Sequence, residues 1–243
     1  MAVKLIDEHL RSYIDDIRDI GLLTLLTWKG ADVAPAWKGP YQPCTRSNDA
    51  ALASLARFNR DHYLFYRAFV ERYMEKRGKV LDVGCGSGQR TSMLARYSES
   101  VMAIDSDPSK ISIGAIINHA NNIEWLYDEF ISWSEQNEDT FDYIFAVEMI
   151  EHVPLAMHTI FIDKLTKKLN SGGALFITTP KDKEIERVPP HIGLWDPSMA
   201  EQCSQVFDLE IKYFNVNQLQ GDGEDPWSDE KAGTHYVAIG KKQ

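Results

Sequence analysis

A glycine-punctuated segment, Val80 to Gly88, is the part of the chain best suited to binding a ligand. It reads as a buried strand that ends at Val83 and turns into a helix-forming segment from Thr91 to Tyr97. Glycines at alternate positions allow a sharp turn and leave room for a ligand against the backbone. The N–H groups at the start of the next helix favour an anionic or polar ligand. An ordinary strand-to-helix turn also favours glycine, so other residues must separate the two interpretations.

The spacing of the glycines distinguishes between nucleotide cofactors. A dinucleotide fingerprint that opens on Gly84 requires a third glycine at position 89. That position is Gln89, and the third glycine falls one residue earlier, at Gly88. A dehydrogenase is therefore disfavoured. Cys85 lies inside the loop, and we interpret it as a small packing residue rather than a nucleophile.

Two further strand ends carry carboxylates that suit a nucleoside. Asp105 ends an apolar run, where a carboxylate can accept hydrogen bonds from both hydroxyls of a ribose. A solvated charge that caps the strand is the alternative. Asp128 follows the next expected strand and can accept from an adenine amine, and Glu129 competes with it for that role.

Glu148, Glu151 and His152 follow the fourth expected strand. In a helix that begins near Glu148, offsets of three and four place all three on one face. Two carboxylates and an imidazole can hold Mg²⁺ or Mn²⁺, and His191 beyond the fifth strand can add a fourth ligand. Acidic side chains also complement the dipole at a helix start, and His152 also suits a structural role. The sequence leaves both interpretations open.

These candidate residues follow successive strands of one alternating pattern. Strands are expected at Lys79–Val83, Ser100–Ile104, Ile123–Tyr127, Tyr143–Val147, Ala174–Thr178, Leu209–Phe214 and His235–Ile239. Strands that alternate with helices predict an α/β fold with a doubly wound, mostly parallel sheet. A loop rich in Gly, Asp and Pro joins the last two strands and predicts a C-terminal antiparallel hairpin. Such sheets bind ligands beyond the carboxyl ends of their strands, which brings the candidate residues to one edge.

The N-terminal quarter has a different pattern. Residues 1 to about 27 read as helical, and residues 28–48 hold three prolines, two glycines and two tryptophans. Prolines at this density interrupt regular structure. We expect residues 1–55 to form a helical cap or lid on a domain at 56–243. This segment contains the aromatic residues Trp28, Trp37 and Tyr41. We expect them either to close over an apolar ligand or to anchor the cap.

Composition limits the class of protein. The chain has 243 residues, of which 44% are hydrophobic, and a net charge of −10. A field of this sign repels nucleic-acid backbones, so nucleic-acid partners are disfavoured. The three cysteines are odd in number and far apart, which favours neither a disulfide framework nor a zinc cluster.

No apolar run approaches the roughly 20 residues of a membrane helix, and the first ten residues lack a signal-peptide pattern. We therefore expect a cytoplasmic protein without membrane insertion.

The order of these motifs resembles that of class I S-adenosylmethionine-dependent methyltransferases. The resemblance covers roughly residues 56–240 and includes Asp-x-Gly-x-Gly-x-Gly, Asp105, Asp128 and the segment 141–153. Glu-x-x-Glu-His after the fourth strand further resembles the branch that contains ubiquinone-pathway O-methyltransferases and small-RNA terminal 2′-O-methyltransferases. The family implies a seven-stranded, Rossmann-like sheet and S-adenosylmethionine as the methyl donor.

The resemblance also implies site residues. In that branch an arginine ahead of the glycine loop reaches the carboxylate of the cofactor; Arg60 is the best match, with Tyr63 and Arg67 as rivals. The expected cofactor-binding residues are Arg60, Asp82, Gly84, Cys85, Gly86, Asp105, Ser106, Asp128, Glu129 and Val147. In the small-RNA enzymes two glutamates and two histidines hold a metal that grips vicinal hydroxyls. The matching candidate ligands for a divalent cation are Glu148, Glu151, His152 and His191.

Methyl transfer to a hydroxyl needs an aligned acceptor and a group that takes its proton. His152 is the candidate base and His191 the second candidate, although His152 cannot act as base while it binds a metal. The principal hypothesis is O-methylation of a small-molecule acceptor. The alternatives are a metal-assisted RNA 2′-O-methyltransferase and a cofactor-binding subunit that transfers no methyl group.

Overall fold

A computed structural model of the chain describes residues 70–118, 120–181, 192–193, 195, 207–214, 227–228 and 235–243. The expected cap at residues 1–55 lies outside the described residues, as do Arg60 and His191. Among the described residues, no helix is long and apolar enough to cross a membrane.

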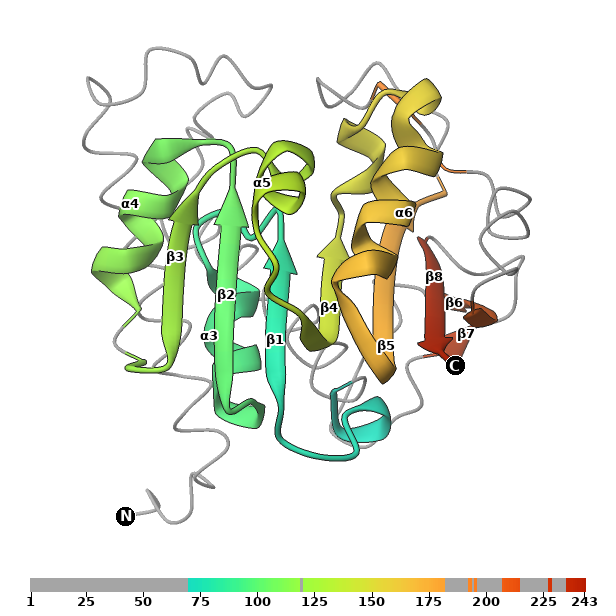
Figure 1. Ribbon diagram of the computed structural model, residues 1–243, viewed down its shortest axis with the longest axis horizontal. Coiled ribbons are helices and arrows are strands. Elements are labelled where there is room, and N and C mark those ends of the chain that lie inside the picture. The colour runs from blue at the N-terminus through green and yellow to red at the C-terminus, as the bar shows by residue number, and fades with distance from the viewer. Residues whose placement is uncertain are drawn as a thin grey trace, which may run out of the picture.

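The described part of the chain is organised around one eight-stranded sheet with the order β3-β2-β1-β4-β5-β8-β6-β7 (Figure 1). The strands are β1 (Lys79–Val83), β2 (Ser100–Asp105), β3 (Ile123–Tyr127), β4 (Phe141–Val147), β5 (Leu169–Pro180), β6 (Phe207–Phe214), β7 (Trp227–Ser228) and β8 (His235–Lys242). Strands β1 to β5 are parallel, whereas β8 is antiparallel to both β5 and β6. The predicted mostly parallel sheet with an antiparallel C-terminal pair is confirmed, and the two-residue β7 is added to the seven expected strands.

Helices cover both faces of this sheet. Buried side chains place α3 (Gln89–Tyr97) and α4 (Pro108–Ile117) on one face, and α5 (Phe130–Gln136) and α6 (His158–Lys168) on the other. Two 3-10 turns, η1 (Ile150–His152) and η2 (Leu155–Met157), lead from β4 into α6. In Figure 1, α6 crosses in front of the sheet and α3 lies behind it.

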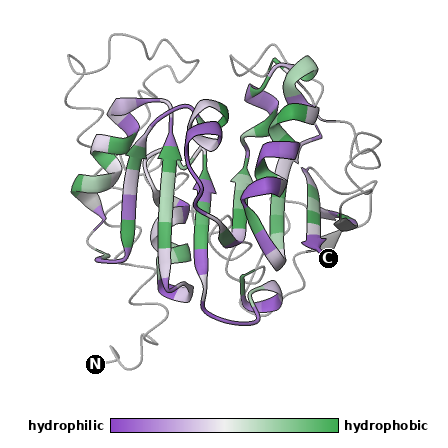
Figure 2. Ribbon diagram, in the orientation of Figure 1, coloured by the Kyte–Doolittle hydropathy of each residue, from purple (hydrophilic) through white to green (hydrophobic). Residues whose placement is uncertain are grey.

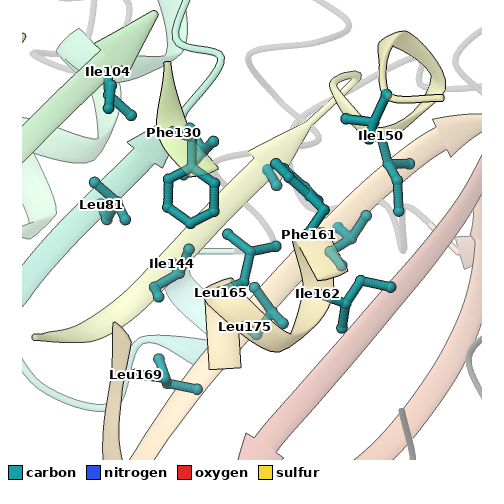
Figure 3. Packing of buried hydrophobic residues seen from close by; sticks show 14 of the residues in the cluster. Leu81, Ile104, Phe130, Ile144, Ile150, Phe161, Ile162, Leu165, Leu169 and Leu175 are labelled. Atoms are coloured by element: carbon teal, nitrogen blue, oxygen red, sulfur yellow. The ribbon is translucent and has the colours of Figure 1, made fainter. Parts of the chain in front are cut away.

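The side chains of β1 show why both faces need a cover. Val80 packs in the same buried cluster as Leu94 of α3, whereas Leu81 packs in the cluster of Phe161 of α6. Successive side chains of a strand point to opposite faces, so a central parallel strand is apolar at nearly every position. In Figure 2 the central strands are coloured mainly as hydrophobic, with a few hydrophilic bands. Figure 3 shows the packing of this cluster, which includes Leu81, Ile144 and Leu175 of the strands and Phe161 and Leu165 of α6.

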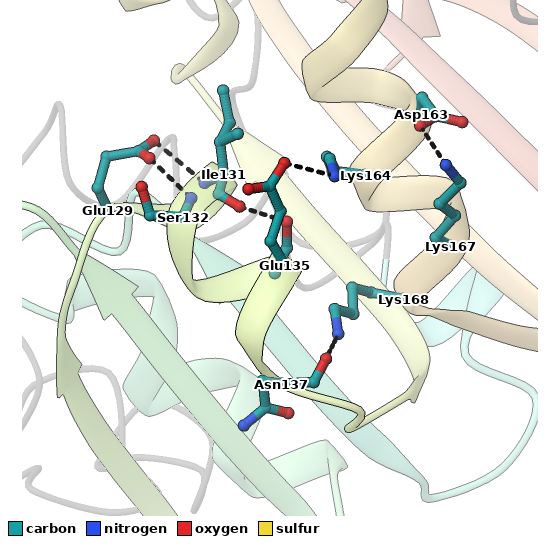
Figure 4. A network of polar contacts seen from close by, with 10 residues as sticks. Glu129, Ile131, Ser132, Glu135, Asn137, Asp163, Lys164, Lys167 and Lys168 are labelled. Carbon is teal, nitrogen blue, oxygen red and sulfur yellow. Dashed lines mark hydrogen bonds and ion pairs between the residues drawn. The ribbon is translucent and has the colours of Figure 1, made fainter.

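Polar contacts join α5 to α6 at the rim of this core (Figure 4). Lys164 Nζ lies 2.8 Å from Glu135 Oε1, and Lys168 donates to the carbonyl oxygen of Asn137. Exposed ion pairs contribute only about 0–1 kcal/mol each, whereas one fully buried Leu or Phe side chain contributes about 1.5–3 kcal/mol. Apolar burial is therefore the main force that holds the two helices on the sheet.

The direction of β8 determines what lies at the ligand-binding edge. Its first residue, His235, pairs with Pro180, the last residue of β5. The amino end of β8 therefore lies beside the carboxyl ends of the parallel strands. Both ends are brought to the edge at which doubly wound sheets bind their ligands.

Candidate active site

The glycine loop after β1 has a backbone that glycine accommodates far better than other residues. The φ angles of Gly84, Gly86 and Gly88 are 70°, 57° and 81°, in the left-handed region that costs other residues roughly 1–2 kcal/mol. A Cβ atom on Gly84 would lie 2.9 Å from Met149 Cγ, whereas one on Gly86 would meet no atom within 4 Å. The space in front of Gly86 is open, so a ligand can approach the backbone there.

Gly88 allows a close contact with an indole ring. A Cβ atom at Gly88 would contact Cη2 of Trp125 and lie 2.8 Å from Nδ2 of Asn118. A Cβ atom at Gly114 of α4 would lie 2.5 Å from Cζ3 of the same indole ring. Trp125 of β3 therefore packs between the start of α3 and the middle of α4. The third glycine of the loop serves helix packing.

Asp105 ties the loop to β2. Its Oδ2 accepts a hydrogen bond from the Gly86 N–H at 2.8 Å, and its Oδ1 accepts from the Asp107 N–H at 2.9 Å. Each carboxylate oxygen can accept more than one hydrogen bond, so Asp105 can also accept from ligand hydroxyls. Ser106, the next residue, is exposed. The predicted ribose-binding carboxylate thus lies beside the open part of the loop.

Asp82 of β1 connects the strand that precedes the loop to the helix that follows it. Its side chain is buried, and its Oδ2 accepts a hydrogen bond from the Thr91 hydroxyl at 2.6 Å. Burial raises the pKa of Asp82, and this effect outweighs the opposing effects of Arg90 and Thr91. Arg90 also donates to the carbonyl oxygen of Val147 at 3.1 Å. The first turn of α3 therefore connects the ends of β1 and β4.

The environment of Cys85 agrees with a packing role. The side chain is buried in a cluster with Ala103 and Ile111. Burial raises the pKa of the Cys85 thiol well above its ordinary value, and the nearby carboxylates of Asp82 and Asp105 add to this effect. The thiolate, which is the nucleophilic form, is therefore strongly disfavoured.

The structure distinguishes the environments of Asp128 and Glu129. Both carboxylate oxygens of Glu129 cap α5, because they accept from the N–H groups of Ile131 and Ser132 at 3.1 and 2.9 Å (Figure 4). The Asp128 N–H donates to the Asp105 carbonyl oxygen at 3.2 Å, which fixes Asp128 beside the end of β2. The Asp128 carboxylate accepts the Glu129 N–H through Oδ1 at 2.8 Å, so its Oδ2 can accept from a ligand, whereas both oxygens of Glu129 serve the helix cap.

Glu148 directly follows β4 and has a strained backbone conformation. Among the described residues it is the non-glycine residue with a positive φ, 50°. Its N–H donates to the Thr178 carbonyl oxygen at 3.0 Å, and the Thr178 hydroxyl donates to Glu148 Oε1 at 2.7 Å. Nε2 of His235 lies 3.4 Å from Glu148 Oε2. Residues held in this backbone region by their surroundings occur most often at functional sites.

A helix that begins near Glu148, the condition for placing Glu148, Glu151 and His152 on one face, is not formed. The single turn η1 begins at Ile150, and Glu148 is held by Thr178 instead of by a helix. Glu151 is consequently buried at 1% exposure, whereas His152 is exposed. Within the described ranges, no group of three His, Cys, Asp or Glu side chains could hold a metal ion. Because His191 lies outside those ranges, we derive no metal chemistry from this segment.

The two glutamates have opposite protonation tendencies. Burial raises the pKa of Glu148, but the hydrogen bond and charge of His235 and the Thr178 hydroxyl outweigh it, so the pKa lies below its ordinary value. Burial, followed by the negative charge of Glu148, raises the pKa of Glu151 to about 8. Near neutral pH the site therefore holds an ionised Glu148 beside a largely neutral Glu151.

The turn that carries Glu151 is held by residues from two other segments. The Glu151 carbonyl oxygen accepts from the N–H groups of Ile192 and Gly193 at 2.9 and 3.0 Å. Buried His158, the first residue of α6, donates from Nε2 to the Val153 carbonyl oxygen at 2.9 Å. A Cβ atom at Gly193 would lie 2.8 Å from that nitrogen. These contacts connect the turn after β4 to residues that follow β5.

Sequence reasoning missed Thr178 and His235 as site residues. A signal for His235 was present, because a hairpin makes the last strand antiparallel and brings its first residue to the carboxyl ends of the others. No comparable signal marked Thr178, which is one of two adjacent threonines at the end of β5. Long-range pairing, rather than local spacing, brings both residues to Glu148.

The chain belongs to the methyltransferase-domain family, because residues 57–211 match the family model described as "Methyltransferase domain". The ubiquinone biosynthesis O-methyltransferase of Bartonella tribocorum is 29% identical over 156 residues, which cover 60% of each protein. The mitochondrial ubiquinone biosynthesis O-methyltransferase of Rattus norvegicus is 33% identical over 118 residues, which cover 45% of this chain and 33% of that protein. The matches thus span less than two thirds of these relatives.

A solved structure shows the same fold. The N-methyltransferase NodS from Bradyrhizobium japonicum WM9 in complex with S-adenosyl-L-homocysteine has a TM-score of 0.57 and 18% sequence identity. The similarity covers 76% of this chain and 87% of that chain. The predicted class I methyltransferase family is confirmed, as is the resemblance to the ubiquinone O-methyltransferase branch.

Proposed function

We propose that this protein is an S-adenosylmethionine-dependent methyltransferase that methylates a hydroxyl of a small-molecule acceptor. One observation carries the proposal: the Asp105 carboxylate accepts the Gly86 N–H at 2.8 Å beside a loop surface that is open in front of Gly86. Family membership and the relatives named as O-methyltransferases support the same reaction class. Because the chain spans only part of those relatives, the acceptor and the whole activity are proposed rather than transferred from them.

The residues around the loop fit S-adenosylmethionine. Asp105 can accept from ribose hydroxyls, Asp128 from the adenine amine, and the open backbone at Gly86 leaves room for the cofactor chain. S-adenosylmethionine, when bound, supplies a methyl group that is activated by its attachment to a sulfonium. The predicted contacts of Arg60, Ser106 and Val147 remain part of the proposal.

The acceptor side lies at the ends of β4, β5 and β8. There Glu148 has a defined orientation, because Thr178 and His235 hold its two oxygens separately. A carboxylate fixed in this way can accept a hydrogen bond from the acceptor and align it, which is the main task of an enzyme whose methyl donor is already activated. His152 and His191 remain the proposed bases for the acceptor proton.

Methyl transfer to hydroxylated small molecules tests this proposal. The purified chain is mixed with S-adenosylmethionine labelled in its methyl group and a panel of hydroxylated aromatic acceptors, with and without EDTA. Label in an O-methyl product is the expected result. Binding of S-adenosylhomocysteine without transfer to any acceptor would favour the cofactor-binding subunit, whereas transfer to RNA that EDTA abolishes would favour the RNA enzyme. The net charge of −10 disfavours nucleic acid, and a cytoplasmic location remains a prediction from composition.

A further inference from the structure

Arg90 of α3 holds the peptide group that precedes Glu148 on the side opposite to Thr178. Its guanidinium donates to the Val147 carbonyl oxygen at 3.1 Å. The Glu148 N–H, at the other end of the same peptide group, donates to the carbonyl and hydroxyl oxygens of Thr178 at 3.0 and 3.1 Å. A trans peptide group is planar, with its C=O and N–H on opposite sides. The plane of the Val147–Glu148 peptide group is therefore fixed from both sides.

The pairing between β1 and β4 ends before it reaches the Val147 carbonyl group. The last pair of that ladder is Asp82 and Phe145, and β1 itself ends at Val83, where the chain enters the glycine loop. A buried backbone carbonyl group needs a hydrogen-bond partner. Arg90, in the first turn of α3, supplies the donor that a longer neighbouring strand would otherwise provide.

This peptide group sets the backbone conformation of Glu148. The φ angle of a residue depends on the orientation of the preceding peptide group, and Glu148 has a φ of 50°. A non-glycine residue keeps this conformation only where its surroundings hold it. Thr178 and His235 contact the carboxylate, whereas Arg90 and Thr178 hold the backbone from which the carboxylate projects. Loss of Arg90 would release one side of the peptide group and allow Glu148 to relax.

Two contacts connect the Glu148 segment to the candidate cofactor loop. Arg90 lies two residues after Gly88, in the helix that directly follows the loop. Met149 packs against Gly84, because a Cβ atom on that glycine would lie 2.9 Å from Cγ and 3.0 Å from Sδ of the methionine. Both sequence neighbours of Glu148 are thus in contact with the loop or with its helix.

We infer that Arg90 is a positioning residue for methyl transfer, which fixes the Val147–Glu148 peptide group and thereby directs the Glu148 carboxylate toward the acceptor. The inference rests on the proposed function, in which Glu148 aligns the acceptor. In this role Arg90 acts through Glu148 rather than by contact with the acceptor. An enzyme whose methyl donor is already activated depends mainly on alignment of the acceptor, so a changed orientation of Glu148 is expected to lower the rate of transfer.

Amide hydrogen exchange, measured by NMR on the unliganded chain, tests the effect of Arg90 on Glu148. Arg90→Met removes the donor and keeps an apolar stem. The Glu148 N–H is expected to exchange at least about tenfold faster in this variant, because local opening no longer breaks the charged hydrogen bond to Val147. The Val101 N–H, which donates to the Asn122 carbonyl oxygen at 2.8 Å, is the reference and should change far less. Equal acceleration of both amides, or no acceleration at Glu148, overturns the inference.

A double-mutant cycle with Glu148→Gln tests whether Arg90 acts through Glu148. With the panel acceptor that is methylated fastest, Arg90→Met is expected to lower kcat/KM about tenfold or more and to change S-adenosylhomocysteine affinity less than about threefold. In the Glu148→Gln background the same substitution should cost less than about threefold in kcat/KM, since the two residues act as a unit. Losses that multiply in the double variant overturn the inference.

Arg96→Met is the matched control, because Arg96 is an exposed arginine in the last turn of the same helix. It is expected to leave Glu148 exchange and kcat/KM unchanged. Arg90→Lys keeps the charge but replaces the planar fork of donors with a single ammonium, so it is expected to give smaller losses of the same kind. If Arg90→Met does not fold, an Arg90→Lys chain with the exchange and activity of the unmodified chain overturns the inference.

The two experiments separate this inference from the proposed function. If S-adenosylhomocysteine does not bind or no acceptor is methylated, the proposed function is contradicted, and the hydrogen-exchange comparison alone decides whether Arg90 positions Glu148. If methyl transfer occurs and the cycle shows independent losses, only the inference is contradicted.

Discussion

The carboxylate of Glu148 lies 3.4 Å from Nε2 of His235, which joins the carboxyl end of β4 to the amino end of β8. β5 lies between these two strands, and its Thr178 hydroxyl donates to the other oxygen of the same carboxylate. Glu148 thus links three neighbouring strands at the edge of the site. Its left-handed backbone is maintained by these long-range contacts rather than by a local turn.

Replacement of Glu148 with Gln should reduce methyl transfer while cofactor binding persists. The amide retains an oxygen for Thr178 but loses the charge that faces His235, and hydrogen bonds to charged groups contribute about 1.5–3 kcal/mol. We expect a roughly tenfold to hundredfold lower kcat/KM. Binding of S-adenosylhomocysteine should change little. Glu210→Gln is the control, because Glu210 is an exposed residue paired with Lys212; equal losses of binding and activity in Glu148→Gln would contradict this role.

Gly86→Ala should affect ligand binding more than folding. Its Cβ would meet no protein atom within 4 Å, so the folding cost is the backbone strain at φ 57°, roughly 1–2 kcal/mol. The same methyl group would project into the open space at the loop. S-adenosylhomocysteine affinity by calorimetry should fall at least about tenfold, which corresponds to 1.4 kcal/mol. Unchanged affinity would show that the space in front of Gly86 is not the cofactor site.

Gly88→Ala, in contrast, should affect folding more than ligand binding. Its Cβ would clash with the Trp125 indole and approach Asn118, so overpacking of about 1–3 kcal/mol is added to the backbone strain. Urea denaturation should show a larger loss of stability than in Gly86→Ala. Trp125→Leu makes space at this contact, so the double variant should be more stable than the sum of the two single changes predicts. Strict additivity would contradict the packing role of Gly88.

Glu151 should make stability decrease with rising pH. Its pKa is about 8 in the folded protein against an ordinary 4.5, so between these values the folded chain holds a proton that the unfolded chain has released. The free energy of unfolding then falls by up to about 1.4 kcal/mol per pH unit. Glu151→Gln removes this dependence. The stability of the variant relative to the unmodified chain should rise between about pH 5 and about pH 8, and a constant difference in urea denaturation would contradict the raised pKa.

Local sequence patterns predicted the strands of the central sheet well. β1 and β3 have the expected bounds, because each is a short segment rich in apolar residues with clear breaks at both ends. β5 begins at Leu169, earlier than the expected Ala174. Its early part contains Gly172 at φ 75°, and the β4–β5 register shifts there. An irregularity of this kind depends on the neighbouring strand and has no clear local signature.

The part of the candidate site at the ends of neighbouring parallel strands could be predicted from the sequence. Asp105 and the glycine loop lie together because parallel neighbours β1 and β2 bring their carboxyl ends to one edge. The backbone from Glu148 to His152 could not be predicted from its helical spacing, since hydrogen bonds to Thr178 of another strand hold Glu148 outside a helix. The catalytic and metal-binding roles of these residues remain predictions.

Titration of S-adenosylhomocysteine into the chain, its Asp105→Asn variant and its Asp107→Asn variant tests the central claim most directly. Asp105→Asn loses the charge beside Gly86 and should bind at least about tenfold more weakly. Asp107 caps α4 through the Ser109 N–H, a role that Asn also fills, so Asp107→Asn should bind as the unmodified chain does. The account predicts binding of S-adenosylhomocysteine by the unmodified chain and a selective loss in Asp105→Asn. No binding by the unmodified chain, or binding of NAD in its place, would contradict it.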